Sequence, residues 1–141
     1  MKNKLVMIMM ILLVAIALAG AVALVFVLKY TNVDPGSEPP IEQVLDVSVD
    51  IPEVTTNLAN DGFVRISFKI QTDSKKAKKE LEQRMFQVNN IIILELSDKT
   101  AETIKGKEGH RQFEEELKGK INEIMQEGKV EQVYITQFIL Q

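Results

Sequence analysis

The sequence predicts an α+β domain, with helices packed on a mostly antiparallel sheet, attached to a single N-terminal transmembrane helix. Three observations lead to this prediction. An uncharged apolar run fills residues 5–28, segments of alternating polarity follow it, and helix-like segments then precede a β-branched segment that ends at Gln141. Strands, then helices, then a final strand is an order typical of helices that cover one face of an antiparallel sheet.

Residues 5–28 predict a retained membrane anchor. A cleaved signal peptide has an apolar region of about 7–15 residues, and this run is longer. As a helix rising about 1.5 Å per residue, it spans the roughly 30 Å of a hydrocarbon core. Ala17 with Ala19, or Ala21 with Ala23, could mimic a cleavage site. Cleavage there would leave an apolar new N-terminus, so a cleaved signal is the less favoured alternative.

The charges beside the run predict its orientation. Two lysines precede it, and only Lys29 follows it closely before the first acidic residues. The positive-inside rule places residues 1–4 in the cytoplasm and the rest outside the cytoplasmic membrane, as a single-pass protein. Residues 31–40 hold three of the 4 prolines. We therefore expect residues 29–52 to form a juxtamembrane linker and extended arm, and residues 53–141 to form the extracytoplasmic domain.

Small residues gather in the middle of the apolar run. Residues four apart share one helix face, and small side chains let two helices approach closely in lipid. The candidates for membrane helix packing are Ala15, Ala19, Gly20 and Ala23. The alternative, that alanine is simply common in membrane helices, stays open.

Three segments after the linker predict strands. Residues 45–51 alternate apolar and polar side chains and end at Pro52, which is typical of a half-buried strand or an extended arm. Residues 54–59 and 63–72 flank Asn60-Asp61-Gly62. The Asp-Gly pair favours the positive φ of a tight turn, so these two segments predict a hairpin.

Residues 75–96 predict an amphipathic helix of about 20 residues, because apolar residues recur at spacings of three and four. Asp73 or Ser74 could cap it. Its last turns are apolar on every side, so we expect either deep burial or contact with another subunit. The candidates for an oligomer or partner contact are Phe86, Ile91, Ile93 and Leu94.

The same helix begins with four lysines, Lys75, Lys76, Lys78 and Lys79. The helix macrodipole disfavours positive charge at this end. A solvated face is the favoured interpretation, and an acidic partner or anionic lipid head groups are the alternative. Farther along, residues 97–106 predict a short second helix that Ser97 caps and Gly106 ends. Residues 110–127 predict a third helix, and residues 130–141 a final strand.

The composition excludes several classes of function. Because the chain has 0 cysteines, it cannot form disulfides or thiolate zinc sites and cannot use thiol catalysis. Its 1 histidine, His110, is interpreted as an incidental surface residue. Glu114 to Glu116 are consecutive and splay around a helix. The part of the chain after the apolar run is acidic, which argues against nucleic acid as a partner. We therefore predict a protein that is not an enzyme and has no cofactor, metal site or catalytic residue.

The chain resembles the FliL family of flagellar basal-body-associated membrane proteins. The resemblance lies in the basic N-terminus with its single span, VTTNLAN, FVRISFKIQ, IIILELSDKTAETIKGKEG and the ending VEQVYITQFILQ. With LEQRM and LKGKINEIM, these segments are distributed over nearly the whole chain. The ending is the most specific of them.

The resemblance implies an extracytoplasmic domain like that of stomatin (SPFH) scaffold proteins. Such a domain would form a homo-oligomeric ring around the stator units (MotA/MotB type) of the flagellar motor. It would stabilise or modulate those units at the basal body, in support of swimming and swarming. Its partners would be itself, the stator subunits, the basal body and membrane lipid. A generic membrane-anchored extracytoplasmic sensor or ligand-binding module stays open as the alternative.

Overall fold

The structure is a computed structural model that describes residues 2–30 and 38–141. These residues belong to two compact units, an N-terminal helix and an α+β domain. Helix α1 (Lys2–Tyr30) is long and apolar enough to cross a membrane, and its side chains from Lys2 to Lys29 are exposed within its own unit. This agrees with the helix predicted over residues 5–28. Of the linker and extended arm predicted over residues 29–52, residues 31–37 lie outside the described residues, residues 41–46 form a helix and the first strand begins at Ser48.

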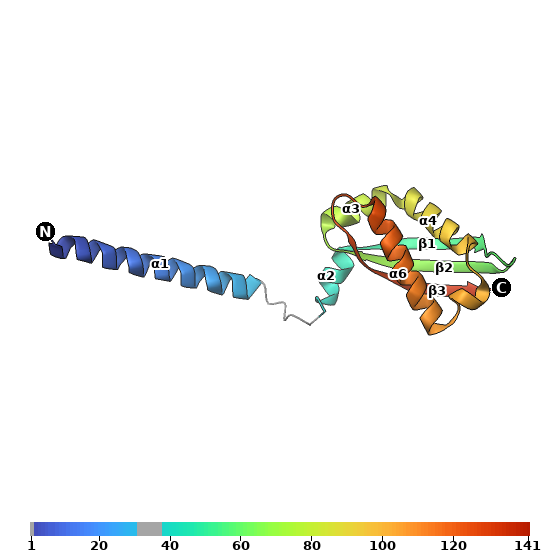
Figure 1. Cartoon of the computed structure of the whole chain (residues 1–141), viewed down its shortest axis with the longest axis horizontal. Helices are drawn as coiled ribbons and strands as arrows, with labels where there is room; N and C mark the ends of the chain where they lie inside the picture. The colour runs from blue at the N-terminus through green and yellow to red at the C-terminus, as the bar shows by residue number, and fades with distance from the viewer. Residues whose placement is uncertain (1, 31–37) are drawn as a thin grey trace. The chain divides into compact units, whose positions relative to one another are not determined.

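The domain is built on a three-stranded antiparallel sheet with the order β1-β2-β3 (Figure 1). The strands are β1 (Ser48–Asn57), β2 (Phe63–Thr72) and β3 (Val130–Leu140). The helices are α2 (Ile41–Asp46), α3 (Lys75–Gln83), α4 (Met85–Ser97), α5 (Ala101–Ile104) and α6 (Gly106–Ile124). Because α4 and α6 lie on the same face of the sheet, the domain has two layers (Figure 1).

The core lies between the sheet and the helices. Alternate residues of β2 are buried, and the ring of Phe68 packs against that of Phe113 on α6 with centroids 6.2 Å apart. The opposite face of the sheet carries polar residues. On it Arg65 pairs with Glu53 at 2.8 Å, and Lys69 pairs with Asp50. This division confirms the two-residue period read from the sequence of β2.

The prediction of four strands is wrong for the described residues. The two segments predicted over residues 45–51 and 54–59 form one strand, β1, and Leu45 belongs to α2 instead. Pro52 does not end the strand, because β1 lies at the edge of the sheet and its register shifts between Ile51 and Val54. Such an irregularity on an edge strand accommodates a residue that has no N–H to donate.

The single helix predicted over residues 75–96 is two helices. Helices α3 and α4 meet at Arg84, whose φ of −91° and ψ of 12° leave the helical region. The Arg84 N–H still donates to the carbonyls of Glu80 and Leu81, at 3.0 and 3.1 Å. The interruption is therefore small, and the predicted apolar positions stay buried on both sides of it. Ser74 caps α3 as predicted, accepting from the Ala77 N–H at 3.1 Å.

The boundaries of the next helices also differ from the prediction. Thr100, and not Ser97, caps the short helix α5. Gly106, with φ of +79°, starts α6 instead of ending the short helix. Gly109 explains this early start. A Cβ on Gly109 would lie 2.7 Å from the Thr103 carbonyl oxygen, so the glycine lets α6 begin directly against α5.

Candidate interaction surfaces

The domain exposes an apolar surface on α4. Phe86 is 73% exposed, Leu94 59% and Ile93 40%. We call this surface, formed by Phe86, Asn90, Ile93 and Leu94, the α4 outer face. The only charged residue of α4 is Glu95, which is half-buried and pairs with Lys120 of α6 at 3.8 Å. A contiguous exposed apolar surface without charge is typical of a protein interaction site.

The four residues predicted to contact a partner do not share one environment. Phe86, Ile93 and Leu94 lie on the α4 outer face, whereas Ile91 is partly buried and packs against the core. The buried residues of α4 are Val88, Ile92 and Leu96, so the core-facing side of this helix is as apolar as its outer face. The structure therefore brings three of the four predicted residues together on one surface.

The small residues predicted for membrane helix packing all lie in α1. Ala15 and Ala19 are one turn apart, as are Ala19 and Ala23. A Cβ built on Gly20 would meet no atom within 4 Å in the described residues. No contact within that part of the chain uses the small size of this residue, and helix packing through α1 stays a prediction.

A buried carboxylate joins α3 to the loop between α6 and β3. Glu80 is 8% exposed. Its carboxylate accepts hydrogen bonds from the backbone N–H groups of Gln126 at 2.9 Å and Glu127 at 2.6 Å, and from Arg84 Nε at 2.7 Å. Burial by itself raises the pKa of Glu80, but the three hydrogen-bond donors outweigh burial, so that this pKa lies below its usual value.

Two further contacts hold the same loop. Asn122 at the end of α6 accepts from the Val130 N–H at 2.7 Å and donates to the Val130 carbonyl at 3.1 Å. Gly128, with φ of +143°, lies so close to α3 that a Cβ would come within 2.8 Å of the Ala77 Cβ. Sequence reasoning missed this arrangement because Glu80 and Arg84 look like an ordinary surface pair one helical turn apart.

The lysines of α3 form a basic surface beside this loop. Lys76 Nζ lies 3.5 Å from a carboxylate oxygen of Glu127. Within the described part of the chain, no carboxylate oxygen lies within 4.0 Å of Lys75, Lys78 or Lys79. We call these four residues the α3 lysines. They correspond to the basic run that the sequence analysis singled out.

Three titratable side chains of α6 contact other elements of the domain. His110 is partly buried, unlike the surface residue expected, because α6 begins early and brings its ring to 4.5 Å from that of Phe138. Glu114 accepts from the Ile135 N–H at 2.8 Å, where β3 is irregular. Glu116 pairs with Lys99 at 2.5 Å. Residues 2–30 and 38–141 contain no group of acidic, histidine or cysteine side chains that could hold a metal ion.

Comparison with known proteins gives a consistent result. The family model described as "Flagellar basal body-associated protein FliL" matches residues 48–141. A protein of Bacillus subtilis (strain 168) described as "Flagellar protein FliL" is 48% identical over 141 residues, which is 100% of both chains. A protein of Aquifex aeolicus (strain VF5) with the same description is 31% identical over 93 residues, 64% of this chain and 58% of that relative.

Proposed function

The chain belongs to the FliL family of flagellar basal body-associated proteins, and on this basis we propose that it is a membrane-anchored accessory protein of the flagellar motor. It assembles around the stator units (MotA/MotB type) and stabilises or modulates them in support of swimming and swarming. The observation that carries the proposal is the family membership of the domain together with its uncharged, exposed α4 outer face.

The proposed anchor is α1. The helix is long and apolar enough to span a bilayer. Lys2 and Lys4 lie at its beginning, whereas acidic residues follow Lys29. The positive-inside rule therefore supports a cytoplasmic N-terminus and an extracytoplasmic domain. In this arrangement α1 carries the domain beside other proteins of the same membrane, and the small residues around Gly20 supply a surface for helix packing.

The proposed partner contact is the α4 outer face. A ring of identical subunits needs a heterologous contact, in which one face of each subunit meets a different face of the next. The α4 outer face supplies one of the two contacting surfaces. The next subunit of the ring, or a stator subunit, supplies the second surface. We propose further that the domain is of the stomatin (SPFH) type, as expected for a scaffold that assembles into rings.

The alternative function, a sensor or ligand-binding module, has less support. Ligand pockets are generally apolar clefts of about 300–1,000 Å³. Three hollows of the described domain measure about 270, 450 and 380 Å³, and polar or charged side chains line most of them, Lys99 in the first, Arg111 in the second and Lys79 in the third. Glu80, Glu114 and Glu116 hold the fold together through hydrogen bonds and an ion pair, which supports a role that is not enzymatic.

Deletion of the gene tests the proposed function. We expect impaired swimming or swarming with unchanged growth, and recovery when the wild-type gene is restored. The full-length protein should also co-purify with stator subunits as a ring. Normal motility of the deletion strain, at low and high load, would contradict a role in the motor.

Variants of single exposed phenylalanines test the proposed contact. Phe86→Ser should fail to restore motility and should not co-purify as a ring. Phe63→Ser is the matched control, because Phe63 is also exposed, at 46%, but lies on the face of the sheet opposite the helices. Equal behaviour of the two variants would show that the α4 outer face has no special part in assembly.

A further inference from the structure

We propose that the α3 lysines hold one end of the domain against the membrane surface by binding anionic lipid head groups. This inference rests on the proposed anchoring of the chain by α1, and it assigns a second membrane contact to the domain itself. The partner is the lipid surface. An acidic protein partner is an outcome that the experiment below distinguishes.

The α3 lysines lie at the end of the sheet where the chain enters the domain. Helix α2 leads directly into β1, and Ser48 of β1 pairs with Gln71 near the end of β2. The Thr72 hydroxyl donates to the Val47 carbonyl at 2.6 Å. Because α3 begins at Lys75, α2 and α3 lie at the same end of the domain, away from the turn between β1 and β2 (Figure 1).

The covalent chain keeps this end close to the anchor. Between Tyr30, the last residue of α1, and Ile41, the first residue of α2, the chain has ten residues. A fully extended chain spans at most about 3.6 Å per residue, so the start of α2 lies within roughly 40 Å of the end of α1. The tether is therefore attached at the end of the domain that carries the α3 lysines, so these lysines can reach the lipid surface.

Three of the four α3 lysines have no ion pair in the described part of the domain, whereas Lys76 pairs with Glu127. Lys75, Lys78 and Lys79 have no acidic side chain within 4.0 Å in the described part of the chain, and no acidic residue lies in the first turn of α3. The macrodipole opposes positive charge there. An anionic surface would offset both the dipole and the mutual repulsion of the lysines.

The acidic residues at the same end are only partly paired, and Asp73, directly before the α3 cap, is exposed and accepts from the Ser74 hydroxyl at 3.2 Å. Glu127 pairs with Lys76, and Glu131 pairs with Lys129, each at 3.5 Å. Glu42 and Asp46 of α2 are exposed. Glu42 and Asp46 follow directly on Ile41 and Leu45, so their side chains point about 100° away from those two apolar side chains around the helix axis.

Helix α2 adds an apolar contact suited to the same surface. Ile41 is 68% exposed and Leu45 is 50% exposed, and the two residues lie one turn apart on the same side of α2. Exposed apolar side chains together with lysines are the combination with which peripheral segments bind an anionic membrane interface, and both occur at this end of the domain. Lysine heads bind lipid phosphates, while the apolar side chains enter the region below them.

The experiment uses the full-length protein in lipid vesicles. Because the chain has 0 cysteines, one introduced cysteine carries a single fluorophore. Gln83→Cys places it one turn after Lys79, and Asn60→Cys places it in the turn at the other end of the domain. Vesicles contain phosphatidylcholine alone or mixed with phosphatidylglycerol, together with a lipid that carries a quencher on its head group.

We expect phosphatidylglycerol to increase quenching at position 83 but not at position 60. Raising the salt concentration from about 0.1 to about 1 M should reverse the increase, since it shortens the Debye length from about 10 to 3 Å. Each lysine replaced by glutamine should lower the ratio of membrane-bound to detached domain by roughly five-fold. The test variant replaces Lys75, Lys78 and Lys79 together. The control replaces Lys105, Lys107 and Lys118, the same number of charges elsewhere on the domain.

The outcomes separate this inference from the proposed anchoring. Flotation of the protein with neutral vesicles at high salt reports insertion of α1, whatever the α3 lysines do. If the protein floats but phosphatidylglycerol does not change the quenching at position 83, lipid binding by the lysines is overturned and an acidic protein partner takes its place. Equal loss in the test and control variants overturns the assignment to α3. Failure to float contradicts the anchor instead.

Discussion

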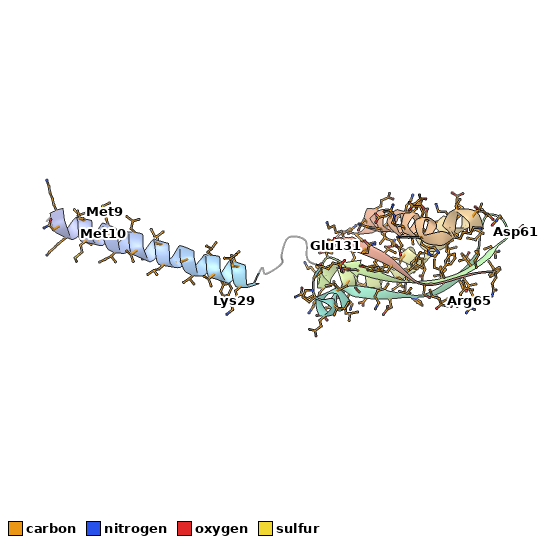
Figure 2. All side chains as sticks on the ribbon, turned by 90° about the horizontal axis from the view of Figure 1, so that it is seen from below. Met9, Met10, Lys29, Asp61, Arg65 and Glu131 are labelled. Atoms are coloured by element: carbon orange, nitrogen blue, oxygen red, sulfur yellow. The ribbon has the colours of Figure 1, made fainter. Side chains whose placement is uncertain are left out.

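Helices α3 and α4 follow each other along the chain, and each departs from the rule that charged side chains are exposed and large apolar ones buried. Helix α3 buries a carboxylate, that of Glu80, whereas α4 exposes the large apolar side chains of Phe86 and Leu94. Figure 2 shows the described side chains of the domain that contains both helices as sticks on the ribbon. Contacts within the domain explain the burial of Glu80, whereas they do not explain the exposure of Phe86 and Leu94.

The difference lies in what each group contacts. The carboxylate of Glu80 has three hydrogen-bond donors from the same domain, so its burial is compensated within the fold. The α4 outer face has no covering element within its own unit. A buried charge with a complete set of partners therefore indicates architecture, whereas an exposed apolar face indicates a contact with another molecule. The predictions below test this distinction.

The largest effect is expected at Glu80. Glu80→Ala removes the acceptor for the N–H groups of Gln126 and Glu127 and leaves the side chain of Arg84 without its ion-pair partner, so that only the hydrogen bond from Arg84 Nη1 to Gln87 remains. Breaking a buried charge pair costs about 3–5 kcal/mol. The free energy of unfolding can be measured by urea denaturation of the full-length protein in detergent, followed by circular dichroism. Glu82→Ala, an exposed neighbour, should change it by no more than about 0.5 kcal/mol. Equal effects of the two substitutions would contradict the structural role of Glu80.

A smaller effect is expected where the loop passes α3. Gly128→Ala would place a Cβ 2.5 Å from Asp73 Oδ1, at a φ of +143° that alanine rarely adopts. We expect a loss of about 1–3 kcal/mol in the free energy of unfolding. Gly119→Ala is the matched control, because a Cβ there meets nothing within 4 Å of it. Alanine within a helix should stabilise the domain by about 0.5–1 kcal/mol. A neutral Gly128→Ala would show that the loop moves away from α3 without cost.

Acid should remove part of the contribution of Glu80. Its pKa is lower in the folded protein than the usual 4.5, so the unfolded chain binds the proton more readily. The stabilisation is therefore complete above pH 4.5 and is lost as the pH falls toward the folded pKa. Denaturation at a series of pH values should show the stability of the wild type converging on that of Glu80→Gln as the pH decreases. A difference that does not depend on pH would exclude ionisation of Glu80 as the source.

Much of this architecture could be predicted from the sequence. The alternation in residues 63–72 and the spacing of Ala77, Leu81, Val88, Ile92 and Leu96 predicted the core, and these helix positions are buried as expected. The boundaries could not be predicted, because they depend on tertiary contacts. Gly109 packs against the backbone of α5, and Pro52 sits in an irregular edge strand. The burial of Glu80 depends on a loop more than 40 residues away, at sequence separations of 46 and 47, which no local pattern reveals.

The burial of the predicted contact residues of α4 could not be predicted either, because it also depends on tertiary contacts. The apolar run of α4 indicated that the helix has more apolar residues than one core-facing side requires, and it left open whether the last turns are deeply buried or meet another subunit. Only the position of α4 on the sheet separates the two alternatives. It directs Val88 and Ile92 inward, leaves Ile91 partly covered and turns Phe86 outward.

The smallest effect on stability, and the sharpest test of the comparison, is expected on the α4 outer face. Phe86→Ser and Leu94→Gln remove large apolar side chains that are mostly exposed, and in each pair the two residues have similar helix propensities. The free energy of unfolding should change by no more than about 0.5 kcal/mol. Ring assembly should nevertheless be lost, as measured by light scattering of the protein purified in detergent. If instead either substitution lowers the stability of the isolated subunit by about 2 kcal/mol or more, the comparison with Glu80 fails, because such a loss is characteristic of a side chain in the core of its own domain.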